Sequence, residues 1–219
     1  MSQYWNWELA QQALPRLMEG FLITLQATVL GSILAMTLGL AIALLRRVSP
    51  WPVRVPLGWT VEFIRSTPLL IQLYVLYIVF PEFGITMSAM TVGILGLGIH
   101  YSTYTSEVYR AGIEAVPVGQ WEAATALSLP ARRTWQVVIL PQALRSVLPN
   151  LGNYVIAMFK DTPYLLAVSV TEMVYEARDF GQENFSYIES FTIAGLIFLA
   201  ASYPASLLTR RLEKHFAHR

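Results

Sequence analysis

Residues 119–144 of the chain read GQWEAATALSLPARRTWQVVILPQAL, a polar stretch between two long hydrophobic runs. The first part of this stretch predicts a short helix, which Leu129-Pro130 is expected to stop because the residue before a proline avoids helical backbone. A second short helix is predicted from Arg132 to Leu140, ending at Pro141. A polar helix-turn-helix within a hydrophobic protein is expected to dock onto a partner.

The composition is that of a chain surrounded largely by lipid. Of its 219 residues, 55% are hydrophobic and 13% are charged, whereas soluble domains carry about 25% charged residues. The net charge of +1 gives no indication of a nucleic-acid partner. The absence of cysteine excludes disulfides, cysteine-based metal sites and thiol catalysis.

Five apolar runs approach the length of about 20 residues that a membrane-spanning helix needs. They predict an all-α polytopic membrane protein with five transmembrane helices, built as a single domain over residues 1–219, with residues 1–20 as an N-terminal interfacial arm. In the first run, small residues recur every fourth position and predict a face for close helix packing. These small residues are Ala27, Gly31, Ala35, Gly39 and Ala43, and the five runs are 21–45, 57–80, 90–109, 147–170 and 190–208.

The basic residues predict the orientation in the membrane. Five spans place the termini on opposite sides, and nearly all of the 15 Lys and Arg residues fall on one of these sides. The other side has Arg16 and Arg178, while Lys160 lies within a run. Lys and Arg accumulate on the cytoplasmic side, so we expect the N-terminus outside and both the C-terminus and residues 119–144 in the cytoplasm.

A pattern that begins with Glu122-Ala123-Ala124 and continues through Ser128 to Leu140-Pro141 resembles the EAA loop of bacterial ABC importer permeases. The resemblance extends over residues 15–210 and is strongest to the permease group for polar amino acids such as histidine, glutamate, glutamine, arginine and opines. The further motifs that match this group are RSTPLLIQL at 65–73, Tyr104 with Glu107 and Arg110, LPQALR at 140–145 and KDT at 160–162.

The resemblance implies the type I ABC importer permease fold, with a cytoplasmic coupling helix in segment 119–144. It further implies a multi-pass protein of the bacterial inner membrane that imports polar amino acids. Its partners would be an ABC ATPase homodimer, a second permease subunit that is identical or paralogous, a periplasmic or extracytoplasmic solute-binding protein and membrane lipid. The residues expected to couple to the ATPase are Trp121, Glu122, Ala123, Ala124, Leu127, Ser128, Leu140 and Pro141.

The chain is not expected to be an enzyme. It has no G-x-x-x-x-G-K-[ST] phosphate-binding loop, so ATP hydrolysis would belong to a separate subunit. No cofactor is expected, and His100, His215 and His218 lack metal-ligand spacing.

Lys160 and Asp161 are the main candidates for substrate binding. A charge at the bilayer centre costs about 2.5–3.5 kcal/mol and therefore faces a protein interior. Pro163 is expected to interrupt the helix, and this pair offers a zwitterion both a cation and an anion. The alternatives are an internal ion pair, or Lys160 bound to Glu107. The complete candidate set is Lys160, Asp161, Thr162, Thr67, Gln72 and Glu107.

Three departures from the family pattern stand out. Ser128 and Ser66 each replace a glycine, and serine tolerates positive φ poorly, so the turn at Ser128 is expected to be tighter or differently angled. Pro163-Tyr164 replaces a small hydroxyl residue and resembles variants among permeases for ectoine and hydroxyectoine, which are alternative cargoes. A passive channel or scaffold is an alternative of another class, but it has no use for a docking helix.

Overall fold

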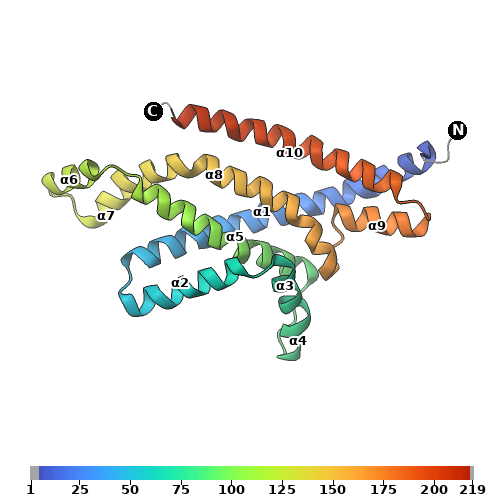
Figure 1. Ribbon diagram of the computed structural model, residues 1–219, viewed down its shortest axis with the longest axis horizontal. Helices are drawn as coiled ribbons and strands as arrows, with labels where there is room; N and C mark the ends of the chain where they lie inside the picture. Colours follow the sequence, from blue (N-terminus) through green and yellow to red (C-terminus); the bar gives the residue numbers. More distant parts are fainter. Residues whose placement is uncertain (1–4, 218–219) are drawn as a thin grey trace.

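A computed structural model describes residues 5–217, and these are helical apart from short connections (Figure 1). Helix α1 (Trp7–Val48) is capped at its N-terminus by Asn6, whose side chain accepts hydrogen bonds from the backbone N–H groups of Glu8 and Leu9. The predicted interfacial arm thus forms the first turns of α1 from Trp7 onward, while residues 1–4 lie outside the described residues. Its position at the membrane interface stays a prediction.

The second apolar run is bent, not straight. Helix α2 (Trp51–Ser66) is followed by α3 (Leu69–Tyr74), the π-helical segment η1 (Val75–Val79) and α4 (Phe80–Glu82). The two halves meet at 104°, and α3 and α4 project away from the long axis of the molecule (Figure 1). The bend lies at Thr67, whose extended backbone (φ −97°, ψ 139°) is the conformation favoured before Pro68.

The remaining elements complete a bundle along the long axis. The N-terminal end of α1 and the C-terminal end of α10 lie at opposite ends of the molecule (Figure 1). Helix α5 packs against α1 and α8, and α10 packs against α8, α9 and α1. The 3₁₀ segment η3 ends at Ser169, which has a φ of 64°. These elements are α5 (Ala89–Glu114), α6 (Val118–Ala126), α7 (Ala131–Arg133), the π-helical segment η2 (Thr134–Ile139), α8 (Leu140–Asp161), η3 (Thr162–Val168), α9 (Met173–Glu183) and α10 (Ile188–Ala217).

The predicted stripe of small residues is the contact between α1 and α5. All five of its members are buried, and the hydroxyl of Thr105 on α5 donates a hydrogen bond to the carbonyl oxygen of Ala35 at 2.8 Å. A backbone-to-hydroxyl bond of this kind requires the helices to approach closely, which small side chains allow. The packing prediction is confirmed.

Two helices of the described chain are long and apolar enough to cross a membrane, namely α1 and residues 188–214 of α10. The bent pair α2–α4 gives a third span if it is counted as one. Helices α5 and α8 carry polar residues such as Glu107 and Asp161, and they correspond to the third and fourth predicted runs. Polar residues in membrane helices face the protein interior, so they indicate a candidate functional site inside the bundle.

Candidate functional site

Helix α6 forms the first half of segment 119–144, and it ends at Ala126, three residues before the predicted stop. Two hydrogen bonds close its end: Leu129 N–H donates to the carbonyl oxygen of Ala124 at 3.0 Å, and Ser128 N–H donates to that of Thr125 at 2.9 Å. This pair of bonds is the Schellman motif, which requires a left-handed residue just beyond the helix. The expected stop at Leu129-Pro130 is therefore placed too late.

Ser128 is the left-handed residue of this motif, with a φ of 51°. Glycine adopts this conformation without steric cost, whereas serine does not. The turn nevertheless keeps the hydrogen bonds of an ordinary Schellman ending. Ser66, the other replacement of a family glycine, lies in the last turn of α2 with ordinary helical backbone, so it imposes no such strain.

The second predicted helix does not end at Pro141. The helical backbone passes from α7 through η2 directly into α8, and Leu140 N–H donates to the carbonyl oxygen of Trp135, five residues back. Proline lacks an N–H and clashes with a helical carbonyl, but a π-helical segment shifts the bonding pattern so that Pro141 fits at the start of α8. The prediction of a break at Pro141 is wrong for this reason.

The two tryptophans of the segment face the protein itself. The rings of Trp121 and Trp135 meet edge to face, 5.3 Å apart. The guanidinium of Arg47, in the last turn of α1, lies 5.2 Å from the Trp121 ring centre and 5.5 Å from that of Trp135. Beneath them, Ile139 and Ala143 are buried. We call Arg47, Trp121 and Trp135 the tryptophan clamp, because they join α6 and η2 to the end of α1.

A second contact holds the segment together. The side-chain amide of Gln142, from the LPQALR motif, donates to the side-chain oxygen of Gln120 at 3.2 Å and to the carbonyl oxygen of Val138 at 2.7 Å. The sequence offers no signal for this pairing, because 22 residues separate the two glutamines. It links the two halves of the segment in space.

The face of α6 away from the clamp is exposed. Glu122, Ala123 and Leu127 are exposed, and Leu127 keeps 73% of its surface accessible. Val118, which no sequence motif indicated, is 70% exposed on the same helix. Of the residues expected to couple, Trp121 and Ala124 therefore pack inward, while Leu140 and Pro141 are half-buried at the start of α8.

Asp161 lies inside the bundle at the end of α8. Its carboxylate accepts a hydrogen bond of 2.7 Å from the hydroxyl of Tyr101 on α5. Tyr104 and Tyr154 complete an aromatic cluster around Tyr101, with ring centres about 6 Å apart. Asp161 lines a cavity of 530 Å³, called here the aspartate cavity, together with residues that include Arg65, Thr67, His100, Tyr104 and Tyr164.

Gln72 and Thr67 stabilise the bend between α2 and α3. The Gln72 side-chain amide donates to the carbonyl oxygens of Ile64 at 2.7 Å and Thr67 at 3.0 Å, at the end of α2 where the regular helical hydrogen bonds cease. It also lies 3.1 Å from Nδ1 of His100. The Thr67 hydroxyl donates to Ile64 as well. These two candidates thus have structural hydrogen bonds, and Thr67 additionally lines the aspartate cavity.

Lys160 faces another part of the molecule. It is exposed and, with Pro163, lines a separate cavity of 480 Å³ bounded by α9 and α10. Thr162 is fully buried, and its hydroxyl donates to the carbonyl oxygen of Phe159 at 2.8 Å. The neighbours Lys160 and Asp161 therefore do not present both charges to one cavity in this conformation.

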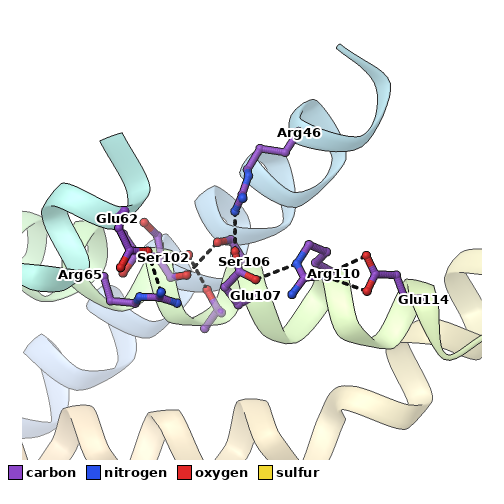
Figure 2. Close-up of polar contacts among 10 residues, drawn as sticks. Arg46, Glu62, Arg65, Ser102, Ser106, Glu107, Arg110 and Glu114 are labelled. Carbon is purple, nitrogen blue, oxygen red and sulfur yellow. Dashed lines mark hydrogen bonds and ion pairs between the residues drawn. The ribbon is translucent and has the colours of Figure 1, made fainter. Parts of the chain in front are cut away.

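Glu107 belongs to a chain of ion pairs on α5. Arg46 of α1 binds one of its carboxylate oxygens, and Arg110 binds the other at 2.7 Å (Figure 2). Arg110 also binds Glu114 at 2.8 Å. The alternative in which Lys160 binds Glu107 is thus wrong for this structure, since Glu107 is already bound by two guanidinium groups.

The chain is similar to known transport proteins over nearly its whole length. It is 45% identical, over 94% of its length and 89% of the relative, to the "Probable amino-acid ABC transporter permease protein y4tG" of Sinorhizobium fredii. It is 35% identical, over 96% of its length and 93% of the relative, to the "L-cystine transport system permease protein TcyB" of Bacillus subtilis. One solved structure, described as "Crystal structure of an amino acid ABC transporter with histidines", matches with a TM-score of 0.86 and 32% identity, covering 93% of this chain and 95% of that one.

These similarities confirm the predicted permease fold and the expectation that the chain is a transport component rather than an enzyme. The family described as "Binding-protein-dependent transport system inner membrane component" matches residues 35–218. The match covers most of the chain and includes segment 119–144 and both cavities. The chain is a member of this family of inner-membrane permease components.

Proposed function

We propose that the chain is the permease subunit of an ATP-driven importer that takes up polar amino acids from an extracytoplasmic binding protein. The observation that carries this proposal is the similarity along nearly the whole chain to proteins named as amino-acid permeases. In the proposed assembly, an ABC ATPase homodimer drives this subunit and a second permease, which is identical or paralogous. The N-terminus lies outside and the C-terminus in the cytoplasm, as the distribution of Lys and Arg favours.

The exposed face of α6 is the proposed ATPase contact. Glu122 offers a carboxylate to a basic residue of the ATPase, and Val118 and Leu127 offer apolar surface to a groove. The tryptophan clamp holds the opposite face of α6 against the permease. Movement of the ATPase is thereby passed to α1 and α8 instead of being lost in a flexible loop.

The aspartate cavity is the proposed amino-acid site. Its 530 Å³ lies in the range of about 300–1,000 Å³ typical of small-molecule pockets. The carboxylate of Asp161 and the ring of Tyr104, which both line this cavity, suit the ammonium group of an amino acid, by charge and by cation–π attraction. Thr67 contributes to the wall, whereas Gln72 and Thr162 hold its shape.

Lys160 and Glu107 have indirect roles in this proposal. Lys160 is next to Asp161 in the sequence but lines a different cavity. An amino acid bound at Asp161 would contact Lys160 only after η3 rearranges. Glu107 lines a neighbouring cavity of 520 Å³ with Arg65 and Tyr154. It is proposed to shape the passage beyond the site.

Ectoine and hydroxyectoine are a second proposed cargo, because Pro163-Tyr164 resembles variants among permeases for these solutes and Tyr164 lines the aspartate cavity. Tyr164 is 47% exposed, and its ring offers an aromatic face to the delocalised cation of such a solute.

The test of cargo reconstitutes the permease with its ATPase and binding protein and screens solutes for stimulated ATP hydrolysis. Ectoine, glutamate, glutamine, arginine and histidine are the first candidates. Stimulation by an amino acid supports the proposed cargo, whereas stimulation by ectoine alone refutes it and leaves the coupling mechanism intact.

Two variants test the proposed contacts of Asp161 with the solute and of Glu122 with the ATPase. Asp161→Asn should abolish stimulation by the identified solute, whereas Glu82→Gln, which changes an exposed carboxylate on α4, should not. Glu122→Lys should uncouple ATP hydrolysis from solute, and Glu82→Lys is its matched control. A passive channel would instead keep its solute flux in Glu122→Lys and without any ATPase.

A further inference from the structure

A basic cavity lies where α1 ends and α2 begins, apart from the aspartate cavity. Its volume is 630 Å³, and its walls come from α1, α2 and α5. Four guanidinium groups line it, those of Arg46, Arg47, Arg54 and Arg110.

The carboxylates around this cavity do not balance its guanidinium groups. Glu107 and Glu114 bind Arg46 and Arg110 (Figure 2). Arg47 lies over the two tryptophans of the clamp, which carry no charge. Arg54 is exposed, and its guanidinium has no ion pair or hydrogen bond within the described residues. The cavity therefore keeps an excess of positive charge, which suits an anion.

An apolar stripe begins at this cavity and follows α2. Trp51, Val55, Trp59 and Phe63 recur every fourth residue, which places them along one side of the helix. The three aromatic side chains are 68%, 75% and 70% exposed, respectively. Val55 and Trp59 also line the basic cavity, so the anion site and the apolar stripe form one continuous surface.

We propose that this surface binds an anionic phospholipid, with the headgroup phosphate among the arginines and an acyl chain along the stripe of α2. Arginine binds phosphate through several N–H donors in a fixed plane, and basic pockets between membrane helices bind anionic headgroups. Tryptophan is favoured at the depth of the headgroups. A free phosphate ion would use the arginines and leave the adjoining aromatic stripe without a role.

The test measures lipid binding to the permease purified in complex with its ATPase, by native mass spectrometry. Phosphatidylglycerol is titrated against phosphatidylcholine with the same acyl chains. Arg54→Gln removes a guanidinium that holds no protein group, so folding is expected to be unaffected. Arg210→Gln, on an exposed position of α10, makes the same change of charge elsewhere. Trp59→Gln tests the stripe.

The wild-type complex should bind phosphatidylglycerol more tightly than phosphatidylcholine. Arg54→Gln should weaken phosphatidylglycerol binding about fivefold, the effect of one basic residue at a membrane surface, and leave phosphatidylcholine unchanged. Arg210→Gln should change neither, and Trp59→Gln should weaken both. Equal binding of the two lipids by the wild type, or an unchanged affinity in Arg54→Gln, would overturn the proposal. Displacement of the lipid by millimolar inorganic phosphate would identify the site as one for the free ion and overturn it as well.

Discussion

Replacement of Gly39 by alanine tests the packing of α1 on α5. A Cβ at this position would lie 2.1 Å from Oγ1 of Thr105, 3.0 Å from the carbonyl oxygen of Ser102 and 3.1 Å from the nitrogen of Ser106. The first contact can be relieved by rotation of a side chain, but the other two involve backbone of α5. The helices must therefore separate, and the Thr105 hydroxyl loses its short bond to Ala35.

Two opposing effects set the size of the change. Overpacking of a tight contact costs about 1–3 kcal/mol, while alanine gains about 1 kcal/mol over glycine in a helix interior. Gly195, within α10, provides a matched control because a Cβ there would have nothing within 4 Å. Gly195→Ala should keep the helical gain, so the two variants should differ by the overpacking cost of about 1–3 kcal/mol.

Thermal unfolding of the detergent-solubilised protein measures this difference, with a shift of about 2–4 °C expected per kcal/mol for a chain of this size. Gly39→Ala should melt below the wild type and Gly195→Ala at or above it. Adding Thr105→Ala to Gly39→Ala removes the atom of closest approach and should recover part of the loss, as expected for two residues in contact. If Gly39→Ala and Gly195→Ala melted together, the close approach of α1 and α5 would be refuted.

Three further changes have defined outcomes. Ser128→Gly should stabilise the end of α6 by up to about 1 kcal/mol, and slower amide exchange there would show it. Ser66→Gly should give no such gain, because the backbone at Ser66 is helical. Arg47→Ala should loosen α6 and lower solute-stimulated ATP hydrolysis more than Arg47→Lys, which keeps a cation over the tryptophans; equal activity in both would argue against the clamp. Burial raises the pKa of Glu172, which caps α9, to about 7. Because the folded state holds this proton more tightly than the unfolded chain does, the contribution of Glu172 to stability should be greatest below about pH 4.5 and be lost as the pH rises through about 7. Glu172→Gln should remove this contribution to the pH dependence of melting curves.

Local patterns in the sequence predicted the features that depend on local physics. The small residues of α1 recur at the helical period, so their burial against a neighbour followed from spacing alone. Pro163 predicted that the regular α-helix would not continue, and α8 indeed ends at Asp161, where the 3₁₀ segment η3 begins. The family pattern at Glu122-Ala123-Ala124 located the segment whose exposed helix is proposed to meet the ATPase.

Features that depend on geometry between elements were not predictable in the same way. Successive residues of a helix point about 100° apart, so Lys160 and Asp161 were poor candidates for a single shared site, and the structure places them in different cavities. The role of Gln72 depends on a bend that exposes the carbonyl oxygens of Ile64 and Thr67, which periodicity does not reveal. Pro141 was misinterpreted because a π-helical segment removes the conflict that proline ordinarily creates.

The continuity of η2 with α8 connects the two proposed sites. Helix α8 begins beside the clamp and ends at Asp161, a length of about 33 Å for its 22 residues. Had the chain broken at Pro141, movement of α6 would have been absorbed by a loop before reaching the aspartate cavity. Instead, the helical hydrogen bonds pass a displacement along α8, and bending is expected near Pro149, which supplies no N–H to them. On the proposed function, movement of the ATPase therefore changes the position of Asp161 relative to Tyr101 on α5. This weakens the hydrogen bond from the Tyr101 hydroxyl to the Asp161 carboxylate, and docking at α6 thereby alters amino-acid binding.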